Sequence, residues 1–369
     1  MDTHDIDVAV IGAGIAGASA AASLAADHRV ALIEAEHAPG YHSTGRSAAL
    51  WILNYGPPDV RALTGLSRAF FEAPPAGFTE TPLLTPQPVV FLAPEAQRAA
   101  LAALLAEGLG LREIGIPQVR AIVPALRPGY AVAAAIEQDA FGIDVAGLHQ
   151  GFLRQFRALG GRLVLDQRTG RIERRAGLWH IETAGAVFRA PIVVNAAGAW
   201  GDVVAGQAGV APLGLVPCRR TGVIIDPQPW DVKGWPLLHD VVHAWYCRPE
   251  ARTRLMVTPC DETPMPPHDV QPDELDVAIA IDRMQQALDI EVHRVERRWA
   301  GLRTFTPDRS LAFGWDRAAE GFFWCVGQGG YGIQTSPAAG RFVADVISGR
   351  DPGQASAIVA AVNPARFAA

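Results

Sequence analysis

The sequence predicts an α/β fold in which two domains are interleaved along one chain. Three observations lead to this prediction. A strand, a glycine-rich turn, a helix and a second strand follow one another at the N-terminus; buried strands ending in small residues recur far along the chain; and the segments between them alternate polar and apolar residues, as antiparallel hairpins do. A chain of 369 residues can bury two cores, and no low-complexity linker separates them, so we expect the domains to share segments.

The chain opens with a βαβ unit. Residues 7–11 are an apolar, β-branched strand, residues 18–26 a helix of small residues, and residues 29–34 a second buried strand. This order of elements is typical of a Rossmann-like domain, in which crossover helices join parallel strands.

The turn after the first strand reads Gly12-Ala-Gly14-Ile-Ala-Gly17. Gly12 permits a tight turn, Gly14 lets the backbone approach a pyrophosphate, and Gly17 lets the helix pack on the strand. Glu34 ends the second strand 17 residues after Gly17, near the position of the acid that binds ribose hydroxyls in such folds. Together these residues predict a dinucleotide-binding site.

The remaining elements do not continue a strict βα alternation. Helical spacing and composition predict helices over residues 58–72, 95–107, 144–160, 273–289 and 337–348. Apolar or alternating runs predict strands over residues 82–93, 162–167, 170–177, 177–185 and 190–200, further strand-like segments in residues 212–262, and a last strand with its glycine turn in residues 321–336.

Three of these strands end in small-residue turns, at Gly12–Gly17, Asn195–Trp200 and Gly327–Gly332. Such turns allow a bulky cofactor to approach the main chain at the carboxyl edge of a parallel sheet. Because NAD must dissociate in each turnover whereas a flavin can stay enclosed, three such edges favour a long, buried flavin.

Composition and charge exclude several classes. The 32 Lys and Arg residues against 38 Asp and Glu residues give a net charge of −6, which offers no electrostatic reason to bind nucleic acid. No apolar run is long enough for a transmembrane segment, and no secretory signal precedes the first strand, so we expect a cytoplasmic protein with reduced cysteines. No cysteine or histidine spacing predicts a metal site, and His149, His239, His243 and His268 are expected in solvated or core roles.

Five segments together resemble the FAD-dependent D-amino-acid oxidase superfamily, which includes glycine oxidase and monomeric sarcosine oxidase. They are GAGIAG at Gly12–Gly17, YHSTGRSAA at Tyr41–Ala49, VVNAAGAW at Val193–Trp200, WAGLRTFTPD at Trp299–Asp308 and QGGYGIQTS at Gln328–Ser336. The chain is most similar to the bacterial D-arginine dehydrogenase group and related D-amino-acid dehydrogenases. The resemblance spans nearly the whole chain.

The resemblance implies a fold of two parts. An FAD-binding, Rossmann-like domain of the glutathione-reductase type would comprise residues 1–80, 140–212 and 305–369. An α+β substrate domain with a mainly antiparallel sheet would comprise residues 81–139 and 213–304 and would roof the flavin ring.

The resemblance also implies a set of FAD-binding residues. These are Gly12, Gly14, Ile15, Ala16, Gly17, Glu34, Ala35, Ser43, Thr44, Arg46, Ser47, Ala48, Ala197, Gly198, Trp200, Gly329, Gly330, Tyr331, Gly332, Ile333 and Gln334. For Arg46 an ordinary ion pair is the alternative to a cofactor contact. Since no cysteine stands in GLRTFTPD, where the sarcosine oxidases tether their flavin, we expect non-covalent FAD.

For the substrate, the resemblance places a carboxylate clamp at Arg220 and Arg303, with Arg219 as the rival of Arg220. A carboxylate in a closed cavity needs such a guanidinium fork. Tyr55 and Tyr246 match aromatic positions that close over the substrate. The predicted pocket residues are Leu50, Ile52, Val89, Trp245, Gly330 and Tyr331.

Two departures from the family pattern predict the side chain that is accepted. Val89 and Leu50 stand where the arginine-specific relative carries an acid and a histidine, so a cationic side chain would lack a partner here. We therefore expect oxidative deamination of D-amino acids with neutral, mainly hydrophobic side chains. Hydride would pass from the substrate Cα to flavin N5, and the imino acid would hydrolyse to a 2-oxo acid and ammonia.

Two points stay open. The alternative substrates are glycine, sarcosine and other secondary or cyclic amino acids, and the alternative role is a non-catalytic or electron-relay flavoprotein subunit. For the electron acceptor we favour a quinone or similar compound over O2, because Lys233, the only lysine, lies outside the segments that match an active site.

Overall fold

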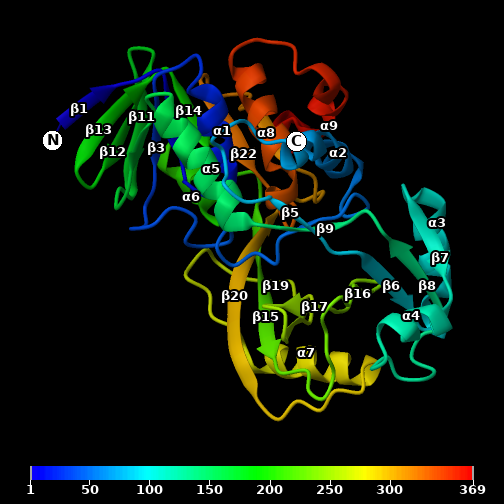
Figure 1. Cartoon of the computed structure of the whole chain (residues 1–369). Helices are drawn as coiled ribbons and strands as arrows, with labels where there is room; N and C mark the ends of the chain where they lie inside the picture. The colour runs from blue at the N-terminus through cyan, green and yellow to red at the C-terminus, as the bar shows by residue number, and fades with distance from the viewer. Residues whose placement is uncertain (1, 368–369) are drawn as a thin grey trace.

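The computed structural model describes residues 2–367. A six-stranded sheet lies in the upper half of the molecule as drawn in Figure 1. The strand order is β10-β3-β2-β14-β22-β21. The strands are β2 (Val8–Ile11), β3 (Val30–Ile33), β10 (Arg162–Val164), β14 (Ile192–Asn195), β21 (Ala312–Trp315) and β22 (Phe322–Val326). All neighbours are parallel except β21, which pairs antiparallel with β22 at the edge. The carboxyl ends of β2, β3, β14 and β22 therefore meet at one edge, as predicted.

Alternation along the strands explains how the two faces of this sheet are covered. Val8 and Val10 of β2 pack with helices α1 (Ile15–Leu24), α5 (Val145–Ala158) and α8 (Gly332–Ile347), while α2 (Pro58–Glu72) packs on α8. Ala9 and Ile11 face the other way. There they pack against a second sheet of order β1-β13-β12-β11, formed by β1 (Asp2–Asp5), β11 (Thr169–Arg175), β12 (Leu178–Thr183) and β13 (Ala186–Ala190).

The lower half of the molecule is a nine-stranded sheet. Its path is β19-β15-β18-β17-β16-β6-β8-β7, and β20 pairs with β15 off this path. The strands are β6 (Val89–Ala93), β7 (Leu111–Ile114), β8 (Ala133–Glu137), β15 (Val216–Ile225), β16 (Leu237–Asp240), β17 (Tyr246–Glu250), β18 (Arg254–Thr258), β19 (Thr263–Pro264) and β20 (Val295–Phe305). Only β16 and β6 pair in parallel, so the sheet is mainly antiparallel and the predicted α/β fold class is confirmed.

The long strands β15 and β20 run from this sheet toward the upper half (Figure 1). Helix α7 (Glu274–Ala287) and helix α4 (Ile116–Ile122) cover one face of the sheet, and α3 (Arg98–Glu107) packs on β6 and β8. A small sheet of β4 (Leu50–Trp51), β9 (Phe141–Ile143) and β5 (Leu84–Pro86) joins the two halves. The other helices are α6 (Gly201–Gln207), α9 (Val359–Val362) and four short 3₁₀ turns. Within residues 2–367, no helix combines the length and the apolar character needed to cross a membrane.

Two sequence predictions need correction. The strand predicted over residues 82–93 is two strands, β5 and β6, which belong to different sheets, because Pro86 and Pro88 lack the N–H that a continuous ladder requires. Helix α8 starts at Gly332, five residues before the predicted start, and Pro337 lies inside it. The Ser336 hydroxyl donates to the Ile333 carbonyl, which Pro337 cannot satisfy. The boundaries of the two predicted domains stay a prediction.

Candidate cofactor and substrate site

A long cavity runs from the carboxyl edge of the parallel sheet to the face of β15 and β20. Of the predicted cofactor residues, it is lined by Gly12, Gly14, Ile15, Ala16, Glu34, Ala35, Ser43, Thr44, Arg46, Ser47, Ala48, Ala197, Gly198, Trp200, Gly329, Gly330, Gly332 and Ile333. Gly17 packs beneath the turn, and Tyr331 and Gln334 line a second, adjoining cavity. Segments far apart in the sequence therefore meet around one elongated space.

The glycine turn fits the main chain closely. Gly12 has a φ of +100°, and a Cβ there would lie 2.6 Å from the Ala196 carbonyl oxygen. Gly14 is the N-cap of α1, whose Ile15 N–H donates to the Thr44 hydroxyl at 2.9 Å. The positive end of the helix dipole therefore faces the cavity, as a pyrophosphate site requires.

Glu34 is fixed at the end of β3. Its carboxylate accepts from the Ala13 N–H at 2.8 Å and from the Glu36 N–H at 3.0 Å. Both oxygens thus hold defined positions on the cavity wall, as the ribose-binding role requires. Residues after β10, which sequence reasoning missed, complete this end: Gln167, Arg168 and Thr169 line the cavity. The adjacency of β10 and β3 brings them there, and no local motif marks them.

The segment Tyr41–Ala49 packs against β20 through hydrogen bonds from Ser43 and Arg46. The Ser43 hydroxyl donates to the Leu302 carbonyl at 2.6 Å. Arg46 lines the cavity, but its guanidinium donates to the Val270 and Ala300 carbonyls and pairs with Asp269 at 2.5 Å. The structure therefore places the charged end of Arg46 in the ion pair that was its alternative role.

The register of β15 and β20 decides which arginines face the cavity. Arg220 lies opposite Gly301 and Cys218 opposite Arg303, so Arg220 and Arg303 share one face of the strand pair. Arg219 lies opposite Leu302 on the other face and pairs with Asp276 of α7 at 2.7 Å. Both Arg220 and Arg303 line the cavity, and Arg219 is excluded as a rival.

Arg303 is a partly buried cation without a carboxylate partner among residues 2–367. Its Nη1 donates to the Tyr55 hydroxyl at 2.9 Å. Burial acts to lower the pKa of Arg303, but the nearby Tyr55, Tyr246 and Cys260 groups outweigh it and the net shift is upward, so the guanidinium stays charged. A Cβ on Gly330 would lie 2.8 Å from both Arg303 Nη1 and the Tyr55 hydroxyl, which explains glycine at this position.

Arg220, in contrast, is paired with an acid. Its Nε donates to the Asp261 carbonyl at 2.8 Å, and its Nη2 donates to Glu262 Oε1 at 2.9 Å. Arg309 donates to the same carboxylate at 3.0 and 2.9 Å. Sequence reasoning missed Glu262 and Arg309, because the contact joins two loops that are distant in the sequence.

A second cavity of about 670 Å³ adjoins the first beside Arg303, within the size range of small-molecule sites. Predicted residues Leu50, Ile52, Tyr55, Tyr246, Gly330 and Tyr331 line it, together with Phe91, Leu104, Leu237 and Val241. These apolar side chains form one part of its wall, and the rest is polar or charged, including Arg61, Arg220, His239, His243, Glu262, Asp308 and Arg309. Burial raises the pKa of Tyr246, and that of Tyr331 to about 12, so both phenols stay protonated. The Gln334 side chain accepts from the Ile52 N–H at 3.3 Å and donates to Thr64 at 2.8 Å, which holds this wall in place.

Two predicted pocket residues lie elsewhere. Trp245 immediately precedes Tyr246, so it faces the opposite side of the sheet, where its indole N–H donates to the Tyr130 hydroxyl at 2.8 Å. Val89 is fully buried in the core cluster, and Phe91, two residues further along β6, lines the cavity instead. Neither Trp245 nor Val89 therefore lines either cavity.

Two histidines that were expected in solvated or core roles form a hydrogen-bonded pair at this cavity. His239 Nδ1 lies 2.5 Å from the Asp240 carbonyl oxygen, which can only accept, so Nδ1 carries the proton. His239 Nε2 therefore accepts from His243 Nδ1 at 3.2 Å. This tautomer assignment leaves His243 Nε2 as a hydrogen-bond acceptor.

We expect His239 to make the protein sensitive to acid. Burial lowers the pKa of His239 from 6.5 to about 3, with a smaller contribution from His243. The unfolded chain therefore binds this proton at a higher pH than the folded chain does. Stability is unaffected by this group above pH 6.5, and it is lost as the pH falls from 6.5 toward 3. The free energy of unfolding should fall by about 1.4 kcal/mol per pH unit in this window from this one group. Thermal unfolding of wild type and His239→Gln from pH 8 to pH 5 checks this, since the variant should lose less stability; equal losses would refute it.

Comparisons with known proteins agree with this geometry. The sequence model of the family described as "DAO: FAD dependent oxidoreductase" matches residues 7–346. A Bos taurus protein, FAD-dependent oxidoreductase domain-containing protein 1, is 28% identical over 178 residues, which cover 42% of this chain and 35% of that protein; the match thus spans about a third of the relative's length.

Solved structures show the same fold. Glycine oxidase from Geobacillus kaustophilus superposes with a TM-score of 0.85 at 21% identity, covering 98% of this chain and 99% of that one. L-proline dehydrogenase from P. horikoshii gives 0.85 at 19% identity over 100% and 98% of the two chains. L-amino acid deaminase from Proteus vulgaris gives 0.76 at 17% identity over 95% and 92%.

Proposed function

Because the chain belongs to the DAO family of FAD-dependent oxidoreductases, we propose that it catalyses the oxidative deamination of D-amino acids with neutral, mainly apolar side chains. FAD is the cofactor of this family, and the chemistry it supplies when bound is the acceptance of a hydride. The substrate loses that hydride from Cα and a proton from nitrogen, and the imino acid then reacts with water to give a 2-oxo acid and ammonia.

The residues of the long cavity fit FAD. The crevice at Gly12 leaves no room for a side chain, the start of α1 offers backbone N–H groups to a pyrophosphate, and Glu34 offers a fixed carboxylate to ribose hydroxyls. Gly222, Gly301 and Gly329 line the part of the cavity beneath β15 and β20, where a flat ring needs close backbone. That the FAD is held non-covalently stays a prediction.

The observation that carries the proposal is the unpaired guanidinium of Arg303. A partly buried cation without an acidic partner attracts an anion, and a carboxylate matches the two-pronged geometry of a guanidinium. In this proposal Arg303 grips the substrate carboxylate and Tyr55 and Tyr246 border the bound amino acid. The same feature argues against a subunit that only relays electrons, which would need no such grip.

The second cavity supports an apolar side chain. Ile52, Phe91, Leu237 and Val241 would surround it and exclude water. Glu262 is an acid at this cavity, but Arg220 and Arg309 already occupy its carboxylate, so it offers no free partner to a cationic side chain.

The stereochemistry and the electron acceptor belong to the proposal as well. The preference for D-amino acids rests on the resemblance of the five sequence segments. A quinone-like acceptor is proposed because Lys233 lies in an exposed loop and lines neither cavity, so no lysine is available there to promote reaction with O2. A cytoplasmic location stays a prediction from the sequence.

Anaerobic reduction of the purified flavoprotein tests the proposal. The flavin absorbance would be followed with D- and L-leucine, D- and L-phenylalanine, D-arginine, glycine, sarcosine and L-proline. We expect D-leucine and D-phenylalanine to bleach the flavin at least tenfold faster than D-arginine or either L-enantiomer. Faster bleaching by glycine, sarcosine or L-proline would replace this substrate class by the alternative one, and bleaching by none of the compounds would favour the relay subunit.

A further inference from the structure

Arg61, Arg220, Arg303 and Arg309 all line the second cavity, and the two that come from the paired strands β15 and β20, Arg220 and Arg303, differ in their pairing. Arg303 has no carboxylate partner among residues 2–367, whereas Arg220 donates to Glu262 at 2.9 Å. In the register of β15 and β20 the two arginines are diagonal neighbours on one face, which places their Cβ atoms roughly 7–8 Å apart. Two carboxylates of one small molecule could reach both groups if both were free.

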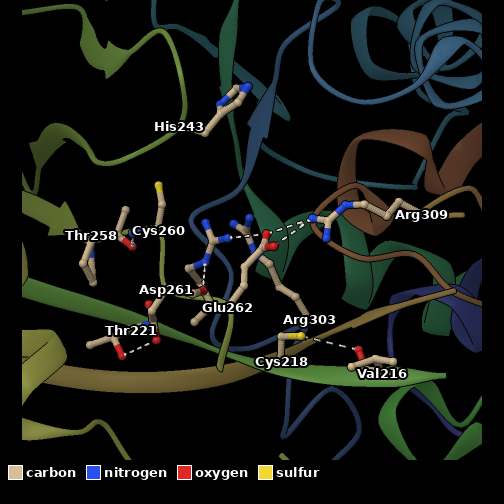
Figure 2. A network of polar contacts seen from close by, with 12 residues as sticks. Val216, Cys218, Thr221, His243, Thr258, Cys260, Asp261, Glu262, Arg303 and Arg309 are labelled. Carbon is tan, nitrogen blue, oxygen red and sulfur yellow. Dashed lines mark hydrogen bonds and ion pairs between the residues drawn. The ribbon is translucent and has the colours of Figure 1, made fainter. Parts of the chain in front are cut away.

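Glu262 prevents this arrangement. Its Oε1 accepts from Arg220. Both of its oxygens also accept from Arg309, as Figure 2 shows. Arg309 thus holds the carboxylate from the side opposite Arg220. A second substrate carboxylate could approach Arg220 only by displacing Glu262 and would meet its negative charge at close range.

We propose that Glu262 restricts the site to substrates that carry one carboxylate, by occupying Arg220 so that no second guanidinium on the strand face of Arg303 is free to bind an acid group. This inference rests on the proposed function, since it concerns the substrate class of that same site. It assigns to Glu262 the rejection of acidic side chains, as in D-aspartate and D-glutamate. Apolar walls alone would disfavour such side chains only through the loss of their hydration.

The variant Glu262→Gln tests the inference, because glutamine keeps the size of the side chain and removes its charge. We expect the ratio of kcat/KM for D-glutamate to that for D-leucine to rise at least tenfold over wild type. Glu250→Gln is the matched control: Glu250 pairs with Arg248 at 2.8 Å, its side chain is 36% exposed against 35% for Glu262, and it lines neither cavity. In this control the ratio should stay within twofold of wild type.

Binding of unreactive acids gives a second readout that needs no turnover. Glutarate carries two carboxylates and butyrate one, and their dissociation constants for the holoenzyme can be measured by calorimetry. In Glu262→Gln, glutarate should bind at least tenfold more tightly relative to butyrate than in wild type. The double variant Glu262→Gln/Arg220→Gln should lose this gain, because Arg220 is the freed group that shares the strand face of Arg303, whereas Arg309, which is freed as well, comes from a separate loop.

The outcomes separate this inference from the proposed function. If wild type accepts D-glutamate as well as D-leucine, if Glu262→Gln changes neither the kinetic ratio nor the glutarate preference, or if the double variant keeps the gain, the role of Glu262 is refuted while D-amino-acid oxidation stands. If no amino acid reduces the flavin but Glu262→Gln gains the glutarate preference, the proposed function fails and the role of Glu262 in limiting acid groups is supported.

Discussion

Replacing Arg303 by methionine is expected to lower kcat/KM for the best D-amino acid about 10³-fold. Methionine keeps an unbranched chain of similar length but removes the charge that grips the carboxylate. Losing one member of a buried, hydrogen-bonded charge pair costs about 4 kcal/mol, which corresponds to about three powers of ten in rate. Anaerobic flavin reduction by D-leucine, measured over a range of concentrations, provides the value.

The same substitution should not destabilise the folded protein. Since Arg303 has no acidic partner among the described residues, removal of its partly buried charge breaks no ion pair, and the Tm should be unchanged or higher. Arg303→Lys keeps the charge but loses the planar guanidinium, so its kcat/KM should lie between that of wild type and that of Arg303→Met. Arg298→Met on the same strand is the control, because Arg298 is 46% exposed and lies outside both cavities. If the kcat/KM of Arg303→Met is within threefold of the wild-type value, Arg303 does not bind the substrate carboxylate.

Replacing Gly12 by alanine is expected to abolish FAD binding. The new Cβ would lie 2.6 Å from the Ala196 carbonyl oxygen and would occupy a backbone conformation with φ of +100°. Strand β2 and the turn after β14 would have to separate, which disturbs the cradle at the start of α1. The purified variant should carry less than about a tenth of the wild-type flavin absorbance per protein and should not regain it on addition of FAD, with a stability loss of about 3 kcal/mol.

Gly77→Ala separates backbone strain from steric overlap. Gly77 also has a positive φ, +77°, but a Cβ there meets nothing within 4 Å. This variant should lose about 1 kcal/mol of stability and keep its full flavin content. If Gly12→Ala binds FAD as tightly as Gly77→Ala does, the glycine turn is not part of the cofactor cradle.

Local patterns made the first part of this fold predictable. The glycine turn, the small-residue helix and Glu34 lie within one βαβ unit, so their spacing alone carries the prediction, and the structure has each element in place. Arg303 was predicted because it lies in the segment Trp299–Asp308, which resembles the family pattern. The sequence does not show which alternate residues of a strand face the cavity, so it could not decide between Arg219 and Arg220 in β15. For the same reason Trp245 was assigned to the pocket together with its neighbour Tyr246, which faces the other way.

Contacts between loops that are distant along the chain could not be predicted from the sequence. Glu262 and Arg309 meet through the fold, and neither lies in a pattern that indicates a site. The pairing of His239 and His243 depends on the turn after β16, where the Asp240 carbonyl fixes the tautomer. The split of residues 82–93 was signalled by its prolines, but which sheet each half joins depends on partners elsewhere in the chain.

The residues proposed to bind the substrate carboxylate and those proposed to select its side chain lie in different kinds of backbone. Arg303 projects from the interior of two long paired strands, whereas Glu262, His243 and Arg309 lie outside strands and helices. A strand position is held by hydrogen bonds on its neighbours, while a loop residue can be exchanged or inserted at little energetic cost. Under these proposed roles, substrate range can diverge through changes in the loops of Glu262, His243 and Arg309, while the strand position that binds the acid group is kept.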